Sequence, residues 1–151
     1  MKKTNNNSKE RKQNLTQFAS LVNLAFIDDE FNKEEYELLE KLGDKLGITK
    51  DERLMVLDNP DAFTIEQIES YNKRLEFIFD FFKMIYADNK LDRAEYELVL
   101  KYIQAIGFNI INTKTILNRS IELFEKNDRV FLKGDMSLTE YKNLIFKEDK
   151  A

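Results

Sequence analysis

The chain has 151 residues, 42% of them hydrophobic, a formal net charge of −4, and neither cysteine nor histidine. This length and apolar content suit one globular domain with a sizeable core. The missing residue types exclude disulfides, zinc–thiolate sites, histidine acid–base chemistry and the common catalytic triads, and the negative charge argues against nucleic acid as a partner.

Residues 1–12 are basic and polar, with no apolar stretch behind them, so they do not form a secretory signal. We predict a disordered basic tail on a cytoplasmic protein. A polybasic membrane contact is a weaker alternative, because the tail carries only a few charges. The single proline and four glycines of the chain favour helices throughout the remainder.

The first predicted helix runs up to Asp28 and carries apolar residues at helical spacing, beginning with Leu15 and Phe18. A second helix opens at the capping-box pattern Asn32–Glu35 and stops at Gly47. Gly43 lies inside this helix, where close approach of a neighbouring helix would explain it. On one face of the second helix lie Tyr36, Leu39, Leu42 and Leu46.

A short helix is predicted from the cap Thr49–Glu52 to Leu57, where Asn59 and Pro60 end it. Thr64–Gln67 then opens the central helix, which is apolar on almost its whole circumference between residues 75 and 86. Its charged stripe argues against a membrane span, which needs about 20 mainly apolar residues. We therefore expect the central helix of a soluble core. The stripe consists of Glu76, Asp80 and Lys83.

The second half of the chain repeats these signals. Asp92–Glu95 opens another helix that stops at Gly107, and Asn112 or Thr113 begins the next one. Residues 127–151 form a C-terminal extension, in which Ser137–Glu140 caps a final short helix.

An ungapped offset of 60 residues aligns the segment 25–48 with the segment 85–108. Because such self-similarity indicates a structural repeat, we predict an all-α helical bundle built from two pseudo-symmetric helical hairpins, about 15–57 and 65–126. The domain would span 13–126. The identical pairs are Asp28/Asp88, Glu35/Glu95, Tyr36/Tyr96, Glu37/Glu97, Leu38/Leu98, Lys41/Lys101 and Gly47/Gly107.

The two turns between paired helices are acidic and carry the candidate chemistry. Asp28 and Asp88 fall at helix C-termini, where a carboxylate is disfavoured unless it caps the turn or meets a cation. With Glu35 and Glu95 they form an all-oxygen set suited to Ca²⁺, Mg²⁺ or Mn²⁺. Neither turn is an EF-hand, because the loop glycine is missing. In the alternative interpretation, Glu35 and Glu95 only cap their helices.

Two copies of a buried helix, an Asp-containing turn, a Glu seven positions later and a second helix ending at Gly resemble the TerB-like family. The resemblance runs from about Leu15 to Phe124 and implies an all-helical, cytoplasmic module of bacterial stress-response or tellurite-resistance complexes. It also implies metal binding by Asp28, Glu35, Asp88 and Glu95. The sequence departs from the family directly after each Asp, where Asp29 and Asn89 replace the usual Gly.

The sequence thus predicts a non-enzymatic module that binds divalent cations at its acidic turns and works with another protein in a stress-response or chaperone complex. No nucleophile motif, phosphate loop or cofactor motif accompanies the paired carboxylates, which leaves an enzyme as the third choice. The second choice is a protein–protein interaction domain without metal. In that case the polar stripes or the C-terminal helix contact the partner.

Overall fold

The computed structural model describes the backbone of residues 2–27, 33–88, 91–132 and 137–145, and the side chains of 8–27, 33–87, 91–126 and 137–145. Within these ranges the chain is all-helical and contains no strand, which confirms the predicted all-α class. It divides into two compact units, Met1–Ile65 and Glu66–Ala151. The boundary lies at the predicted start of the second repeat.

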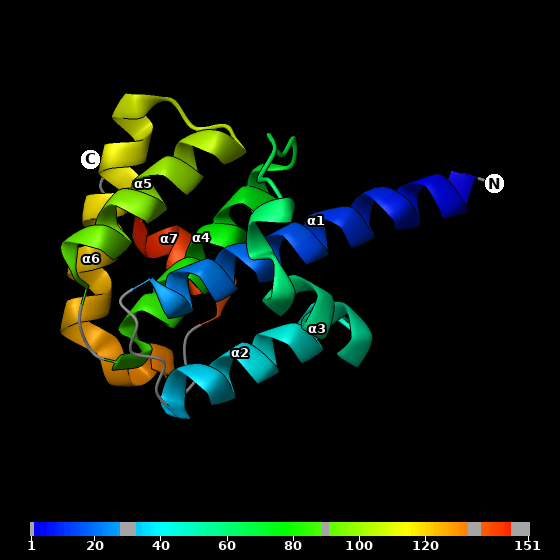
Figure 1. Ribbon diagram of the computed structural model, residues 1–151. Helices are drawn as coiled ribbons and strands as arrows, with labels where there is room; N and C mark the ends of the chain where they lie inside the picture. Colours follow the sequence, from blue (N-terminus) through cyan, green and yellow to red (C-terminus); the bar gives the residue numbers. More distant parts are fainter. Residues whose placement is uncertain (1, 28–32, 89–90, 133–136, 146–151) are drawn as a thin grey trace. The chain divides into compact units, whose positions relative to one another are not determined.

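The first unit contains three α-helices and a short 3₁₀ helix, and α1 packs against each of the others (Figure 1). Its core is built from the C-terminal half of α1, where apolar residues such as Leu21 and Ala25 are fully buried. The elements are α1 (Lys2–Phe26), α2 (Lys33–Lys45), α3 (Lys50–Asp58) and η1 (Pro60–Ala62).

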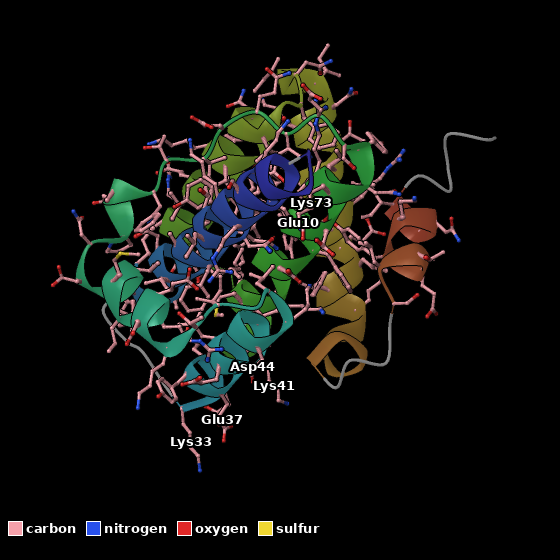
Figure 2. The ribbon with its side chains drawn as sticks, turned by 90° about the vertical axis from the view of Figure 1, so that its right-hand side faces the viewer. Glu10, Lys33, Glu37, Lys41, Asp44 and Lys73 are labelled. Carbon is pink, nitrogen blue, oxygen red and sulfur yellow. The ribbon has the colours of Figure 1, made fainter. Side chains whose placement is uncertain are left out.

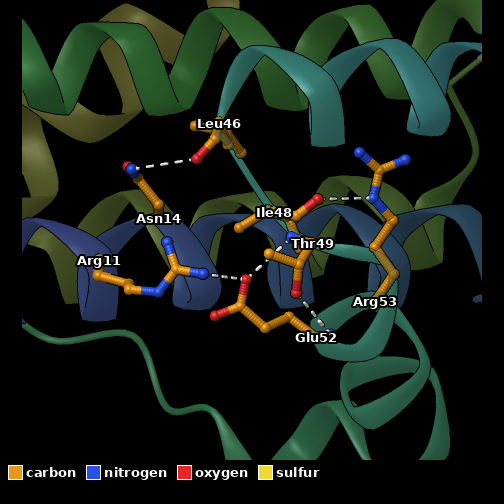
Figure 3. A network of polar contacts seen from close by, with 7 residues as sticks. All are labelled: Arg11, Asn14, Leu46, Ile48, Thr49, Glu52 and Arg53. Carbon is orange, nitrogen blue, oxygen red and sulfur yellow. Dashed lines mark hydrogen bonds and ion pairs between the residues drawn. The ribbon is translucent and has the colours of Figure 1, made fainter.

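Helix α1 begins at Lys2, so residues 2–12, for which the composition predicts a disordered tail, are helical. Two polar contacts hold its N-terminal half to the rest of the unit (Figure 3). Arg11 forms an ion pair with Glu52 of α3. The Asn14 amide Nδ2 donates to the Leu46 carbonyl over 3.3 Å. A helix already nucleated by buried residues extends at low cost, because each added residue gains one hydrogen bond.

The connection between α2 and α3 follows the sequence signals. Gly47 has a φ of +68°, the left-handed conformation that stops α2. Thr49 then caps α3 through the complete box with Glu52, and α3 ends at Asp58, before Asn59 and Pro60. These predictions are confirmed.

The neighbour that Gly43 accommodates is a side chain of α3. A Cβ atom added at Gly43 would lie 2.9 Å from the guanidinium carbon of Arg53. Glycine in the last turn of α2 therefore lets the arginine lie against the helix backbone.

The second unit is organised around α4, whose core-facing residues include Phe77, Phe81 and Phe82, each no more than 1% exposed. Helix α4 packs against α5, α6 and α7, which confirms the central buried helix. The elements are α4 (Tyr71–Ile85), η2 (Tyr86–Asp88), α5 (Arg93–Ile106), α6 (Ile110–Leu132) and α7 (Leu138–Ile145).

Helix α4 begins after Ser70, so the predicted start at Thr64–Gln67 is wrong. The Ser70 hydroxyl accepts from the Lys73 N–H over 3.2 Å. Upstream, the Ile68 N–H donates to the Ile106 carbonyl over 2.9 Å, and the Ile68 carbonyl accepts from Arg74. These bonds pair the Ile68 backbone N–H and carbonyl outside any helix, so the local cap pattern does not start α4 at this position.

Helix α6 starts at Ile110, two residues earlier than predicted, because Asn109 accepts from the Asn112 N–H over 2.8 Å. It runs to Leu132 and so crosses the predicted boundary at residue 127. The predicted cap of α7 is confirmed by reciprocal bonds between Ser137 and Glu140 of 3.1 and 3.2 Å.

The second and third α-helices of the two units begin at equivalent positions. The starts of α2 and α5 differ by 60 residues, and so do those of α3 and α6. Both α2 and α5 stop at a glycine with positive φ, Gly47 and Gly107. The bonds that close these stops also correspond, because Ile48 donates to the Gly43 carbonyl and Phe108 to that of Ile103. These two helix starts and the two glycine stops therefore share the 60-residue offset found in the sequence.

Candidate functional site

Glu95, a predicted metal ligand, lies at the third position of α5 and caps the helix. Its Oε1 accepts from the Asp92 N–H over 3.1 Å, while Asp92 Oδ1 accepts from the Glu95 N–H over 2.8 Å. Only 1% of Glu95 is exposed. The capping role that the sequence offered as an alternative is thus present at this residue.

The second unit brings another carboxylate and a tyrosine close to Glu95. The buried Tyr86 hydroxyl donates to Glu125 of α6 over 2.9 Å. Burial raises the pKa of Tyr86, and the hydrogen bond and negative charge of Glu125 and the charge of Glu95 raise it further. The hydroxyl therefore stays protonated at neutral pH and acts as a donor. Glu125 was not among the predicted site residues.

Of the remaining predicted ligands, Glu35 lies in the first turn of α2 and is 1% exposed. Asp88 is the last residue of η2, and its side chain lies outside the described part of the chain, as does the whole of Asp28. Among the side chains that are described, no group of three or more acids is arranged to hold a metal ion.

The first unit contains an apolar groove of about 550 Å³ that the sequence analysis missed. This volume lies within the range of about 300–1,000 Å³ typical of binding pockets. Its walls come from three helices. Phe18 and Phe26 belong to α1, Tyr36, Leu39 and Glu40 to α2, and Lys50, Arg53, Leu54 and Leu57 to α3.

Several groove residues are accessible to solvent. Leu54 is 59% exposed, Phe26 42% and Leu57 41%. An apolar surface gathered in a concave site is typical of an interaction surface, since scattered exposed side chains would not line a common hollow.

A polar network forms the α2 edge of the groove. Arg53 donates to Glu40 over 2.5 Å and to Asp44 over 2.6 Å, while its Nε donates to the Ile48 carbonyl over 3.0 Å. A hydrogen bond with Glu40 and the charge of that carboxylate raise the pKa of Tyr36. The network fixes the arginine against Gly43 and gives the groove a rigid polar border.

The outer side of α2 has a different character. Figure 2 shows Lys33, Glu37, Lys41 and Asp44 projecting along one side of this helix, with the sign of the charge alternating. Such a stripe is typical of a solvated helix face. Asp44 belongs to both surfaces, because it also binds Arg53.

One sequence signal could have revealed the groove. Leu54, Met55, Val56 and Leu57 are consecutive apolar residues in a helix of 9 residues, so they point in all directions around it. Only Val56 is buried. A short helix with more apolar residues than one face can hold indicates a second apolar contact.

Comparison of the chain with family models, curated proteins and solved structures gave no match. No helix in the described ranges is both long enough and apolar enough to cross a membrane.

Proposed function

We propose that this chain is a non-enzymatic helical adaptor that binds a helix of a partner protein in the groove of its first unit. The carrying observation is the groove itself, in which Phe26, Leu54 and Leu57 remain exposed around a concave apolar surface. Grooves between helices commonly bind the apolar face of an amphipathic helix.

The TerB-like architecture is part of this proposal. The shared helix starts and glycine stops at an offset of 60 residues support a duplicated module. A TerB-like adaptor would act in a bacterial stress-response complex of the tellurite-resistance type, in the cytoplasm. The acids at the starts of α2 and α5 would then serve as helix caps.

The adaptor role is tested by co-purification with the full-length chain as bait. Leu54→Glu places a charge in the groove at an exposed position, so it should remove the specific partner while the fold persists. Ile111→Glu, in the second unit and 75% exposed, is the matched control. A partner identified by mass spectrometry that binds wild type and Leu54→Glu equally would contradict the proposal.

A second candidate function is divalent cation binding at the acidic turns. It is favoured by the presence of a buried carboxylate, Glu35 or Glu95, in the first turn of both α2 and α5, because carboxylate oxygens are the ligands that hard divalent cations prefer. Calorimetric titration with Ca²⁺, Mg²⁺ and Mn²⁺ should show heat with wild type and none with the Glu35→Gln, Glu95→Gln double variant. Absence of heat and of a thermal shift at millimolar metal would exclude this function.

A further inference from the structure

The second unit shows how its own chain covers the residue that corresponds to Phe26. Tyr86 lies 60 positions after Phe26 and is only 1% exposed. The ring of Phe124 stacks on Tyr86 with centroids 5.6 Å apart and planes 18° apart. Phe82 completes the cluster, at 5.5 Å from Phe124. The C-terminal half of α6 therefore closes this side of the unit with an aromatic side chain.

The described residues of the first unit contain no equivalent of that half-helix. Helix α3 starts in register with α6 but ends at Asp58, because Pro60 occupies the position that corresponds to Ser120. The position that corresponds to Phe124 is Thr64, an exposed residue beyond η1. Phe26 keeps 42% of its surface exposed. A helix from another molecule would find an aromatic ring here at the edge of an apolar groove.

The charges around the groove restrict the partner further. On the α2 edge, the carboxylates of Glu40 and Asp44 are 45% and 76% exposed, whereas the Arg53 side chain between them is 18% exposed. These three side chains carry a net charge of −1, and the two acidic side chains are more exposed than the arginine. Lys50 lies on the α3 side.

We propose that the partner segment is a basic amphipathic helix that packs an aromatic side chain against Phe26 and directs its cations toward Glu40 and Asp44. This inference rests on the proposed adaptor function, because it defines the partner of the same groove. Aromatic residues in fully desolvated pockets dominate such interfaces, and charge complementarity selects among partners.

The test uses synthetic helical peptides of about 18 residues, long enough to form a helix alone. The first has leucines at helical spacing, one central phenylalanine and a lysine-rich polar face. The second replaces phenylalanine by alanine, and the third replaces every lysine by glutamate. Binding to the full chain is measured by fluorescence anisotropy. We expect both changes to weaken binding, each by about tenfold or more.

Variants of the chain locate the contact. Leu54→Glu should abolish binding of the first peptide, which carries both the lysines and the phenylalanine (the Lys–Phe peptide). Asp44→Asn should weaken it by about threefold, whereas the matched control Glu37→Gln on the outer stripe of α2 should leave it unchanged. Phe26→Ala should weaken binding of the Lys–Phe peptide and have little effect on binding of the alanine peptide. This difference is expected because a double-mutant cycle detects direct coupling between the two aromatic side chains.

The inference is wrong if the Lys–Phe peptide fails to bind, if the glutamate peptide binds equally well, or if binding survives Leu54→Glu. Any of these results leaves the adaptor function itself to the co-purification experiment, so the two failures can be distinguished. A second copy of the chain is another candidate occupant of the groove, and sedimentation of the chain alone tests for it. Self-association that Leu54→Glu abolishes would identify a second copy and overturn the inference.

Discussion

Phe26 and Tyr86 occupy corresponding positions in the two units but have opposite environments. Phe26 is 42% exposed beside an open groove, and Tyr86 is 1% exposed beneath Phe124. Phe26 is the last residue of α1 and Tyr86 directly follows α4, and the next helices begin in register in both units. The difference arises downstream, in the length of the third helix. One proline at position 60 therefore separates a closed unit from one with an apolar surface available for binding.

The closure of the second unit also involves α7. Tyr141 stacks on Phe79 with centroids 4.7 Å apart and forms a 2.6 Å hydrogen bond with Ser120 of α6. Arg119 donates to the Ile145 carbonyl over 2.6 Å. The long α6 thus packs against an additional helix, and α7, which lies in the predicted C-terminal extension, contacts both α4 and α6.

The largest loss of stability is expected when the aromatic packing of Phe124 is removed. Phe124 is fully buried and contacts the rings of Phe79, Phe82, Tyr86 and Tyr141. Phe124→Ala should lower the free energy of unfolding by about 3–5 kcal/mol, the usual cost of a large buried cavity. Phe26→Ala should cost below about 1.5 kcal/mol, because Phe26 is partly solvated already. Urea unfolding measures both, and equal losses would contradict the comparison.

Replacing the glycine that ends α5 should cost more stability than replacing the glycine that ends α2. At Gly107, with φ of +131°, an added Cβ would lie 2.6 Å from the guanidinium of Arg74. Gly107→Ala should therefore cost about 2–3 kcal/mol through backbone strain and displacement of the arginine. Gly47, with φ of +68°, has open space around it, and Gly47→Ala should cost only about 1 kcal/mol. Thermal unfolding measures both losses. A loss for Gly107→Ala no larger than that for Gly47→Ala would contradict the prediction.

Much of the helical pattern could be predicted because the relevant signals are local. The glycine stops, the boxes at Thr49 and Asp92, and Pro60 act within a few residues of their own position. The start of α4 could not be predicted in this way. The Ile68 N–H is bonded to the carbonyl of Ile106, which is distant in sequence, and periodicity contains no information about that contact.

The groove of the first unit could not be predicted from the sequence, for a related reason. The pattern correctly placed Glu95 in a capping box, since that interaction is local. It placed Tyr36 and Leu39 on one apolar face, but whether such a face is covered depends on a third helix. Leu39 is 4% exposed and Tyr36 is 53% exposed. Burial on a face shared by three helices is a tertiary property.

The hydrogen bond of Tyr86 should contribute a smaller amount to stability. Tyr86→Phe keeps the ring packing and removes the bond to Glu125, so it should cost about 1 kcal/mol in urea unfolding. Phe26→Tyr is the matched change in the first unit and should be nearly neutral, because the added hydroxyl can reach solvent. A Tyr86→Phe variant as stable as wild type would show that the bond makes no net contribution.

The raised pKa of Tyr86 also predicts that the protein loses stability at alkaline pH. Burial raises the pKa of both Tyr86 and Tyr141 above the ordinary value of 10.0. Because the folded-state pKa is the higher one, the contribution of each group is complete below pH 10 and is lost as pH rises toward the folded value. The free energy of unfolding should decline above pH 10, and less steeply in Tyr86→Phe. An identical slope would exclude Tyr86 as a source.

The smallest effect on stability is expected from the variant that matters most for function. Leu54 is 59% exposed, so Leu54→Glu removes little buried area and adds a solvated carboxylate to a helix that tolerates glutamate. The free energy of unfolding should stay within about 0.5 kcal/mol of wild type. Its effect on binding can then be assigned to the groove, because the fold is unchanged. A loss comparable to that of Phe124→Ala would mean that Leu54 belongs to the core of the first unit, and the open groove would no longer distinguish the two units.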